Sequence, residues 1–132
     1  MGRTQQKHRA VLIVEDDADL RSLTVALFED EKVDIIECES AEAALAIMLI
    51  GGTDVAMIFA DIRLPGVMDG VDLAWEVKLR WPLLPVVLTS GRPRDRVGLL
   101  PPGVAYLPKP WLPLDVLIAA ERALASGQDR PS

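Results

Sequence analysis

Five polar side chains stand at or just beyond the ends of four apolar runs. Glu15 and Asp16 follow the first run, and Asp61, Thr89 and Lys109 follow the later three. If the runs are neighbouring parallel strands, three carboxylates, a hydroxyl and an ammonium group meet at one edge of a sheet. Carboxylates hold Mg2+ together with water and phosphate oxygens, and an ammonium group can contact phosphate. The set therefore suits magnesium-dependent transfer of a phosphoryl group onto a carboxylate.

Each of these residues also has an ordinary structural explanation. Acidic side chains cap and stabilise the N-terminus of a helix, which accounts well for Asp17 and Asp19. Helix capping accounts less well for Glu15 and Asp16, which lie between the strand end and the cap. Asp61 precedes a Pro-Gly turn, where an aspartate usually accepts hydrogen bonds from backbone amides. Thr89 and Lys109 fit simple loop positions. The combination at four strand ends, rather than any single residue, favours a reaction.

The composition limits the class of protein. The 132 residues suffice for one domain with a buried core, and the net charge of −6 argues against a nucleic-acid surface. No apolar stretch reaches the ~18 residues of a membrane helix, and the basic leader lacks the apolar segment of a signal peptide. We therefore expect a cytoplasmic protein that binds neither nucleic acid nor membrane.

Cysteine and histidine take little part in these predictions. Cys38 is the only cysteine and His8 the only histidine, so neither an internal disulfide nor zinc chemistry is expected. Cys38 ends a strand-like run and is predicted to be a buried thiol. Arg92, Arg94 and Arg96 form a basic cluster that is either a solvated loop or a docking point for a partner or phosphodonor.

Strand-like and helix-like segments alternate along the chain, which is typical of an α/β domain with parallel strands. Strands are expected at 10–14, 33–37, 55–60, 85–89 and 104–107. Helices are expected at 18–30, 41–49, 72–81 and 114–125. The second strand is the most polar, which predicts an edge position.

Several residues predict where the helices begin, end and face the core. Ser40 is a predicted cap, while Gly51, Pro82 and Gly127 are predicted stops. The first helix is expected to have one apolar face, made of Leu20, Leu23, Leu27 and Phe28. Between the last two strands, helix-breaking residues leave room for at most about two turns around 94–100. They are Pro93, Gly98, Pro101, Pro102 and Gly103.

Four motifs stand at the strand ends: Val11-Leu12-Ile13-Val14-Glu15-Asp16-Asp17, Asp61-Ile62-Arg63-Leu64-Pro65-Gly66 with Met68-Asp69-Gly70, Leu88-Thr89-Ser90-Gly91, and Tyr106-Leu107-Pro108-Lys109-Pro110. In this order and spacing, they resemble the motifs of receiver domains of two-component response regulators. The resemblance implies a receiver domain at 9–126, between a flexible leader at 1–8 and a flexible tail at 127–132. It implies a flavodoxin-like, doubly wound (βα)5 three-layer sandwich with a five-stranded parallel sheet of order 2-1-3-4-5. The fourth helix is expected to be short or irregular.

The resemblance also implies how phosphate and metal would be held. Asp61 would be the phosphoacceptor, attacking a phosphohistidine. Glu15, Asp16 and Asp61 would hold Mg2+ (or Mn2+), with the Arg63 backbone carbonyl as a further ligand. The side chain of Arg63 would stand beside the acceptor, where it could screen the phosphate or guide it in. Val67 lengthens the turn after Asp61 by one residue relative to the usual family pattern, so the shape of that loop is left open.

Three further residues are implied to respond to the phosphate. Lys109 would pair with Asp61 at rest and with a phosphate oxygen afterwards, beside a cis bond to Pro110. Thr89 would be the switch hydroxyl, and Tyr106 the aromatic side chain that follows it. An alternative for Tyr106 is a half-buried aromatic on an edge strand.

The predicted function is that of a response regulator receiver in a phosphorelay. A histidine kinase or histidine phosphotransfer protein would phosphorylate it, and it would control an unknown downstream protein; a homodimer is left open. The chain is not expected to be an enzyme beyond its own phosphorylation and dephosphorylation. Alternatives are a receiver-like interaction module that works without phosphate, or the receiver piece of a hybrid histidine kinase. A phosphatase of the haloacid-dehalogenase type is disfavoured because Arg63 stands where that chemistry needs a second acid.

Overall fold

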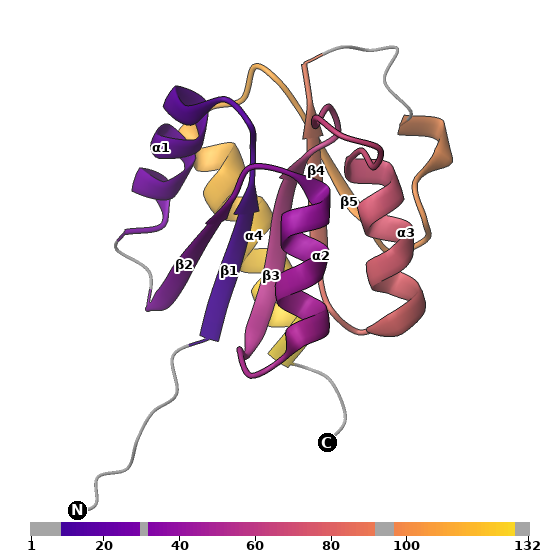
Figure 1. Ribbon diagram of the computed structural model, residues 1–132. Helices are drawn as coiled ribbons and strands as arrows, with labels where there is room; N and C mark the ends of the chain where they lie inside the picture. Colours follow the sequence, from indigo (N-terminus) through magenta and orange to yellow (C-terminus); the bar gives the residue numbers. More distant parts are fainter. Residues whose placement is uncertain (1–8, 30–31, 92–96, 129–132) are drawn as a thin grey trace, which may run out of the picture.

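The computed structural model describes residues 9–29, 32–91 and 97–128, which form a central sheet flanked by helices (Figure 1). Its five parallel strands are β1 (Arg9–Val14), β2 (Val33–Cys38), β3 (Val55–Asp61), β4 (Val86–Ser90) and β5 (Ala105–Pro108). The strand order is β2-β1-β3-β4-β5, so the predicted order 2-1-3-4-5 is confirmed and β2 lies at an edge. All four pairings are parallel, which brings the carboxyl ends of the strands to one edge of the sheet.

In the described parts of the chain, four α-helices connect or follow the strands. They are α1 (Ala18–Leu27), α2 (Ala41–Ile50), α3 (Gly70–Arg80) and α4 (Pro113–Gln128). The segment between β4 and β5 contains only a short 3-10 turn, η1 (Val97–Leu99), among its described residues. The short fourth helix is thus confirmed, and α4 is the helix predicted at 114–125. The basic cluster Arg92, Arg94 and Arg96 lies outside the described residues.

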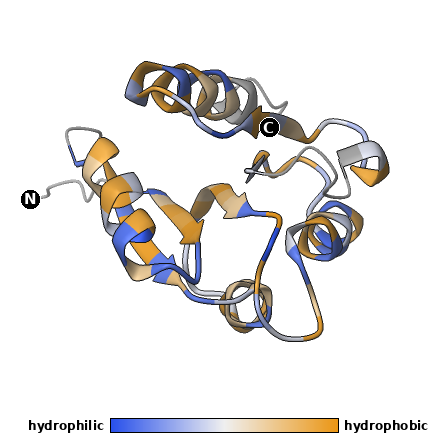
Figure 2. Cartoon of the chain, turned by 90° about the horizontal axis from the view of Figure 1, so that it is seen from above, coloured by the Kyte–Doolittle hydropathy of each residue, from blue (hydrophilic) through white to orange (hydrophobic). Residues whose placement is uncertain are grey.

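The sheet is the middle layer of a three-layer sandwich. Alternate residues of each strand point to opposite faces of the sheet. Residues packed with α2 and α3 include Leu12, Val14, Ile58, Ala60 and Leu88. Residues packed with α4 and with Phe28, at the end of α1, include Val11, Ile13, Met57, Phe59 and Val87. Seen from above, helices lie on both sides of the strands, which are coloured largely as hydrophobic (Figure 2).

The start of α3 differs from the predicted 72–81 range because two aspartates form its cap. The Asp69 carboxylate accepts the Asp72 N–H at 2.9 Å, and the Asp72 carboxylate accepts the Asp69 N–H at 3.0 Å. This reciprocal capping box starts the helix at Gly70. A Cβ at Gly70 would collide with the carbonyl oxygen of Asp61, so glycine allows the helix start to approach the end of β3.

The first helix is shorter than the predicted 18–30 range, and one residue of its predicted apolar face is not buried. Phe28 is fully buried as expected, but Leu23 is 64% exposed, so its predicted burial is wrong. Thr24 is buried instead, and its hydroxyl donates to the carbonyl oxygen of Leu20 at 2.9 Å. That bond satisfies the hydroxyl inside the core, which a purely apolar pattern does not anticipate.

The other helix ends follow the predicted signals, with one exception. Ser40 caps α2 by accepting the Ala43 N–H at 3.0 Å, and Gly51 follows the helix with a positive φ of 77°. The predicted stop at Gly127 is wrong, because α4 continues through this residue to Gln128. None of the helices in the described part of the chain is long and apolar enough to span a membrane.

Candidate functional site

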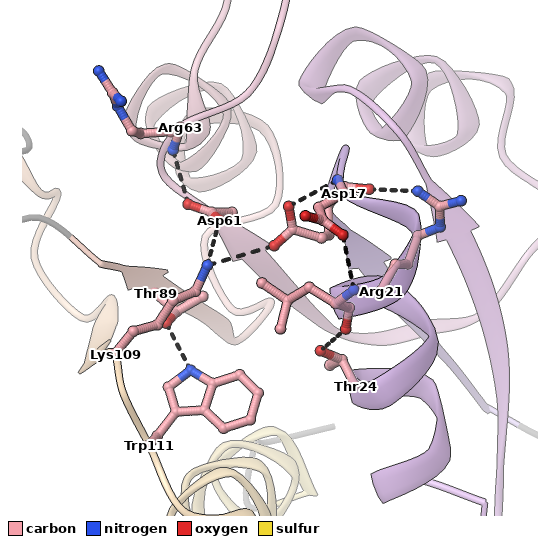
Figure 3. Close-up of polar contacts among 10 residues, drawn as sticks. Asp17, Arg21, Thr24, Asp61, Arg63, Thr89, Lys109 and Trp111 are labelled. Carbon is pink, nitrogen blue, oxygen red and sulfur yellow. Dashed lines mark hydrogen bonds and ion pairs between the residues drawn. The ribbon is translucent and has the colours of Figure 1, made fainter.

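Asp61 is the last residue of β3, and its carboxylate is paired with Lys109. The Nζ of Lys109 lies 2.6 Å from Asp61 Oδ2, as expected for the resting pair. The Arg63 backbone N–H donates to Asp61 Oδ1 at 3.0 Å, so both carboxylate oxygens have a donor. Asp61 is only 7% exposed. The strand end thus presents a buried, fully hydrogen-bonded carboxylate (Figure 3).

Neighbouring strands fix the positions of Thr89 and Lys109 relative to Asp61. Asp61 and Thr89 are register partners in the β3–β4 pair, and the Ile62 N–H donates to the Thr89 carbonyl at 2.8 Å. The Lys109 N–H donates to the Ser90 carbonyl at 2.8 Å, which continues the β4–β5 ladder past the end of β5. The peptide bond between Lys109 and Pro110 is cis, as predicted.

Glu15 is a second buried carboxylate close to the same ammonium group. It is 6% exposed, and its Oε1 lies 3.6 Å from Lys109 Nζ. Burial, together with the neighbouring Asp61 carboxylate, raises the pKa of Glu15 from 4.5 to about 7. The Asp17 N–H, which donates to Glu15 Oε2 at 3.1 Å, and Lys109 act in the opposite direction. One lysine therefore faces two buried acids.

These donors fit a divalent cation. Glu15 and Asp61 are hard oxygen ligands with one positive charge between them, and Asp16 is exposed at the rim of the same edge. A cation would favour the ionised form of Glu15, whose pKa is raised by burial and by the neighbouring Asp61 carboxylate. Within the described residues, no three His, Cys, Asp or Glu side chains are grouped as a ready-made metal site.

Arg21, which no sequence motif indicated, holds the loop that carries Glu15 and Asp16. Its Nη1 donates to the Glu15 carbonyl oxygen at 2.7 Å, and its Nε lies 3.0 Å from Glu37 Oε1 on β2. The guanidinium group thereby links the β1–α1 loop to the edge strand. No local sequence pattern pairs a helix arginine with a carbonyl oxygen in the preceding loop and with an acid on the next strand, so only the fold reveals both contacts.

Trp111 is a second residue that the sequence analysis missed. Its indole Nε1 lies 3.0 Å from Thr89 Oγ1 (Figure 3). The only sequence signal is its position directly after Lys109-Pro110. Tyr106 is half-buried on β5, which forms one edge of the sheet while β2 forms the other. It lines a groove between β5 and α4.

The turn that carries Val67, after Asp61, is hydrogen-bonded to α2. The Glu42 carboxylate accepts the N–H groups of Val67 and Met68 at 2.9 and 3.1 Å. The Val67 side chain itself is 96% exposed. The Arg63 side chain is exposed and points away from Asp61 in Figure 3, while its backbone faces the site.

Comparison with known proteins identifies the family. The model of the response regulator receiver domain matches residues 11–120. The chain belongs to this family. Among curated relatives of this receiver domain, the transcriptional regulatory protein AruR of Pseudomonas aeruginosa is 35% identical over 120 residues, covering 86% of the chain and 48% of that protein. The nitrogen assimilation regulatory protein NtrX of Azorhizobium caulinodans is 32% identical, covering 86% of the chain and 26% of that protein.

Solved structures agree with this assignment. Crystalline NtrX from Brucella abortus superposes with a TM-score of 0.78 at 30% identity, over 92% of this receiver domain and 28% of that chain. The receiver domain spans about half or less of the length of the curated relatives named above. The matched relatives are regulators of two-component systems, and the shared part is their receiver.

Proposed function

We propose that Asp61 accepts a phosphoryl group from the phosphohistidine of a histidine kinase or histidine phosphotransfer protein. An Asp61 carboxylate oxygen attacks phosphorus, the phosphorus–nitrogen bond breaks, and the leaving imidazole keeps the electron pair and takes up a proton. The observation that carries this proposal is the 2.6 Å ion pair between Lys109 and the buried, strand-end Asp61. The chain catalyses only its own phosphorylation and dephosphorylation.

Lys109 has a role before and after transfer. Before transfer, the Lys109 ammonium group neutralises the Asp61 carboxylate. Once Asp61 is phosphorylated, the same ammonium group is available to a phosphate oxygen. Glu15, Asp16, Asp61 and the Arg63 carbonyl would hold Mg2+ or Mn2+. When bound, that ion lowers the repulsion between the acids and the incoming phosphoryl group. The N–H of Arg63 already keeps Asp61 oriented toward the edge of the sheet.

The output is a change of conformation that starts at Thr89. Phosphorylation adds charge and strong acceptors one strand away from the Thr89 hydroxyl. We propose that this hydroxyl donates to the phosphoryl group and that Tyr106, on the adjacent strand, changes rotamer with it. A downstream protein would recognise the altered surface. Since the matched relatives are longer regulators, the downstream partner of this chain stays a prediction.

The test is phosphorylation by acetyl phosphate followed by mass spectrometry of the intact protein. With Mg2+ we expect a gain of one phosphoryl group, and with a chelator we expect little or none. Asp61→Asn should abolish the gain because the amide is not nucleophilic. An unmodified wild-type protein under these conditions would contradict the proposal, as would undiminished labelling of Asp61→Asn.

A further inference from the structure

Thr89 has a hydrogen-bond partner that no receiver motif in the sequence includes. The hydroxyl is almost completely buried, since Thr89 is 2% exposed, and the indole Nε1 of Trp111 lies 3.0 Å from its Oγ1. In Figure 3 the indole approaches Thr89 from below, while Asp61 lies above it. The contact joins the loop after β5 directly to the hydroxyl beside the acceptor.

The indole is held in place by the core on the α1–α4 side of the sheet. Its ring packs edge-to-face on Phe59, with centroids 6.4 Å apart at 83°, and Phe59 packs on Phe28 at 6.3 Å and 67°. Aromatic pairs in this arrangement have a preferred geometry in addition to their buried area. Trp111 is therefore a fixed donor aimed at Thr89 rather than a surface side chain that meets it by chance.

The chemistry of the two groups fixes the direction of the bond. An indole N–H can only donate, whereas a hydroxyl has one proton and two lone pairs. Thr89 must therefore accept from Trp111, and its own proton remains available to another acceptor. Asp61 is the register partner of Thr89 on β3, so the two side chains share a face of the sheet.

We propose that Trp111 is a positioning residue for phosphoryl transfer: it holds the Thr89 hydroxyl as a donor directed toward the group on Asp61. This inference rests on the proposed phosphorylation of Asp61. Without the indole N–H, the hydroxyl is free to rotate and to turn its proton away from the phosphoryl oxygens. Trp111 thus acts through Thr89 and touches no reacting atom itself.

The experiment is a double-mutant cycle on the initial rate of phosphorylation by acetyl phosphate with Mg2+. Trp111→Phe keeps an aromatic ring against Phe59 and removes only the donor, and Thr89→Val keeps the shape and removes the hydroxyl. We expect Trp111→Phe to slow phosphorylation about fivefold, the effect of one hydrogen bond of ~1 kcal/mol. In the Thr89→Val background, the same substitution should change the rate less than about twofold, because no hydroxyl remains to be directed.

Two further variants separate positioning from a structural role. Trp75→Phe is the matched control, since its indole also donates a hydrogen bond, to the Leu99 carbonyl at 2.7 Å, but lies away from Asp61. It should phosphorylate at the wild-type rate. Thr89→Ser restores a hydroxyl, so the fivefold effect of Trp111→Phe should return in that background.

A spectroscopic measurement keeps the inference testable if Trp111→Phe folds poorly. In unphosphorylated protein with Trp111 intact, Thr89→Val should move the indole N–H NMR signal of Trp111 and leave that of Trp75 unchanged. An unmoved signal would overturn the proposal. So would an equal rate loss in the presence and absence of the Thr89 hydroxyl. A wild-type protein that takes up no phosphoryl group would instead overturn the proposed function, and this inference with it.

Discussion

At the scale of single residues, the site is defined by one ammonium group, that of Lys109, which lies close to two buried acids. Lys109 Nζ lies 2.6 Å from Asp61 Oδ2 and 3.6 Å from Glu15 Oε1. Burial of a charge without a partner is costly, so removal of the lysine leaves the buried Asp61 carboxylate uncompensated. The same imbalance makes the edge receptive to a divalent cation and to the charge changes of phosphoryl transfer.

This imbalance predicts a large stability effect for Lys109→Met. In metal-free buffer at neutral pH, we expect the free energy of unfolding to fall by about 2–3 kcal/mol, because loss of the ammonium group leaves the Asp61 carboxylate buried and unpaired. Urea denaturation measures the change. Arg80→Met is the matched control, since its pair with Glu76 is exposed and should be worth at most about 1 kcal/mol. Equal losses in the two variants would contradict the electrostatic account.

At the scale of elements, the turn between β3 and α3 is held by a residue from a different part of the chain. Glu42, in the first turn of α2, accepts the N–H groups of Met68 and Val67. These bonds lower the pKa of the Glu42 carboxyl. At its other end, the turn runs into the aspartate capping box of α3. Both ends of the turn beside the site are thereby held by hydrogen bonds.

We expect Glu42→Ala to release this turn. The amide protons of Val67 and Met68 should exchange with solvent severalfold faster, as measured by hydrogen exchange and NMR. Because the carboxylate is the acceptor and its folded pKa is depressed, the wild-type protection should hold at neutral pH and decline as the pH falls through that pKa. Glu121→Ala, an exposed acid on α4, is the control and should leave both amides unchanged. Unaltered exchange in Glu42→Ala would rule out the clamp.

At the scale of the whole molecule, the two cores on either side of the sheet make the fold one cooperative unit. The accessibility of Cys38 indicates whether this unit is folded, because Cys38 is the last residue of the edge strand β2 yet is buried in the core with α2 and α3. It is 2% exposed, and burial raises the pKa of its thiol to about 11. Its reactivity is therefore limited by opening of the structure.

We predict that Cys38 reacts with a thiol reagent only through unfolding. In native buffer the reaction should be about a thousandfold slower than in denaturant, and urea should accelerate it in parallel with the unfolding transition. Cys38 is the only cysteine in the sequence, so the readout is unambiguous. Fast labelling in native buffer, at the rate of an exposed thiol, would contradict the buried position.

Much of the fold followed from local signals. Apolar runs identified β1, β3, β4 and β5, and the more polar segment at 33–37 identified β2 as an edge strand. Ser40 and Gly51 marked the ends of α2, and the prolines and glycines before β5 accounted for the short η1. One error arose where a tertiary contact overrode the local pattern, because the core selected Thr24 over Leu23. Another was a local signal that was overlooked: the capping box of Asp69 and Asp72 starts α3 at Gly70.

By itself, the sequence determined which chemical groups stand at the strand ends, because residue type and the end of an apolar run are both local properties. It placed Asp61 and Lys109 at two such ends. Only the tertiary structure decided which side chains meet, since contacts such as those of Arg21 with Glu37, Glu42 with Met68, and Trp111 with Thr89 depend on packing between distant segments. Sequence spacing carries no information about such contacts until the sheet order and register bring the segments together.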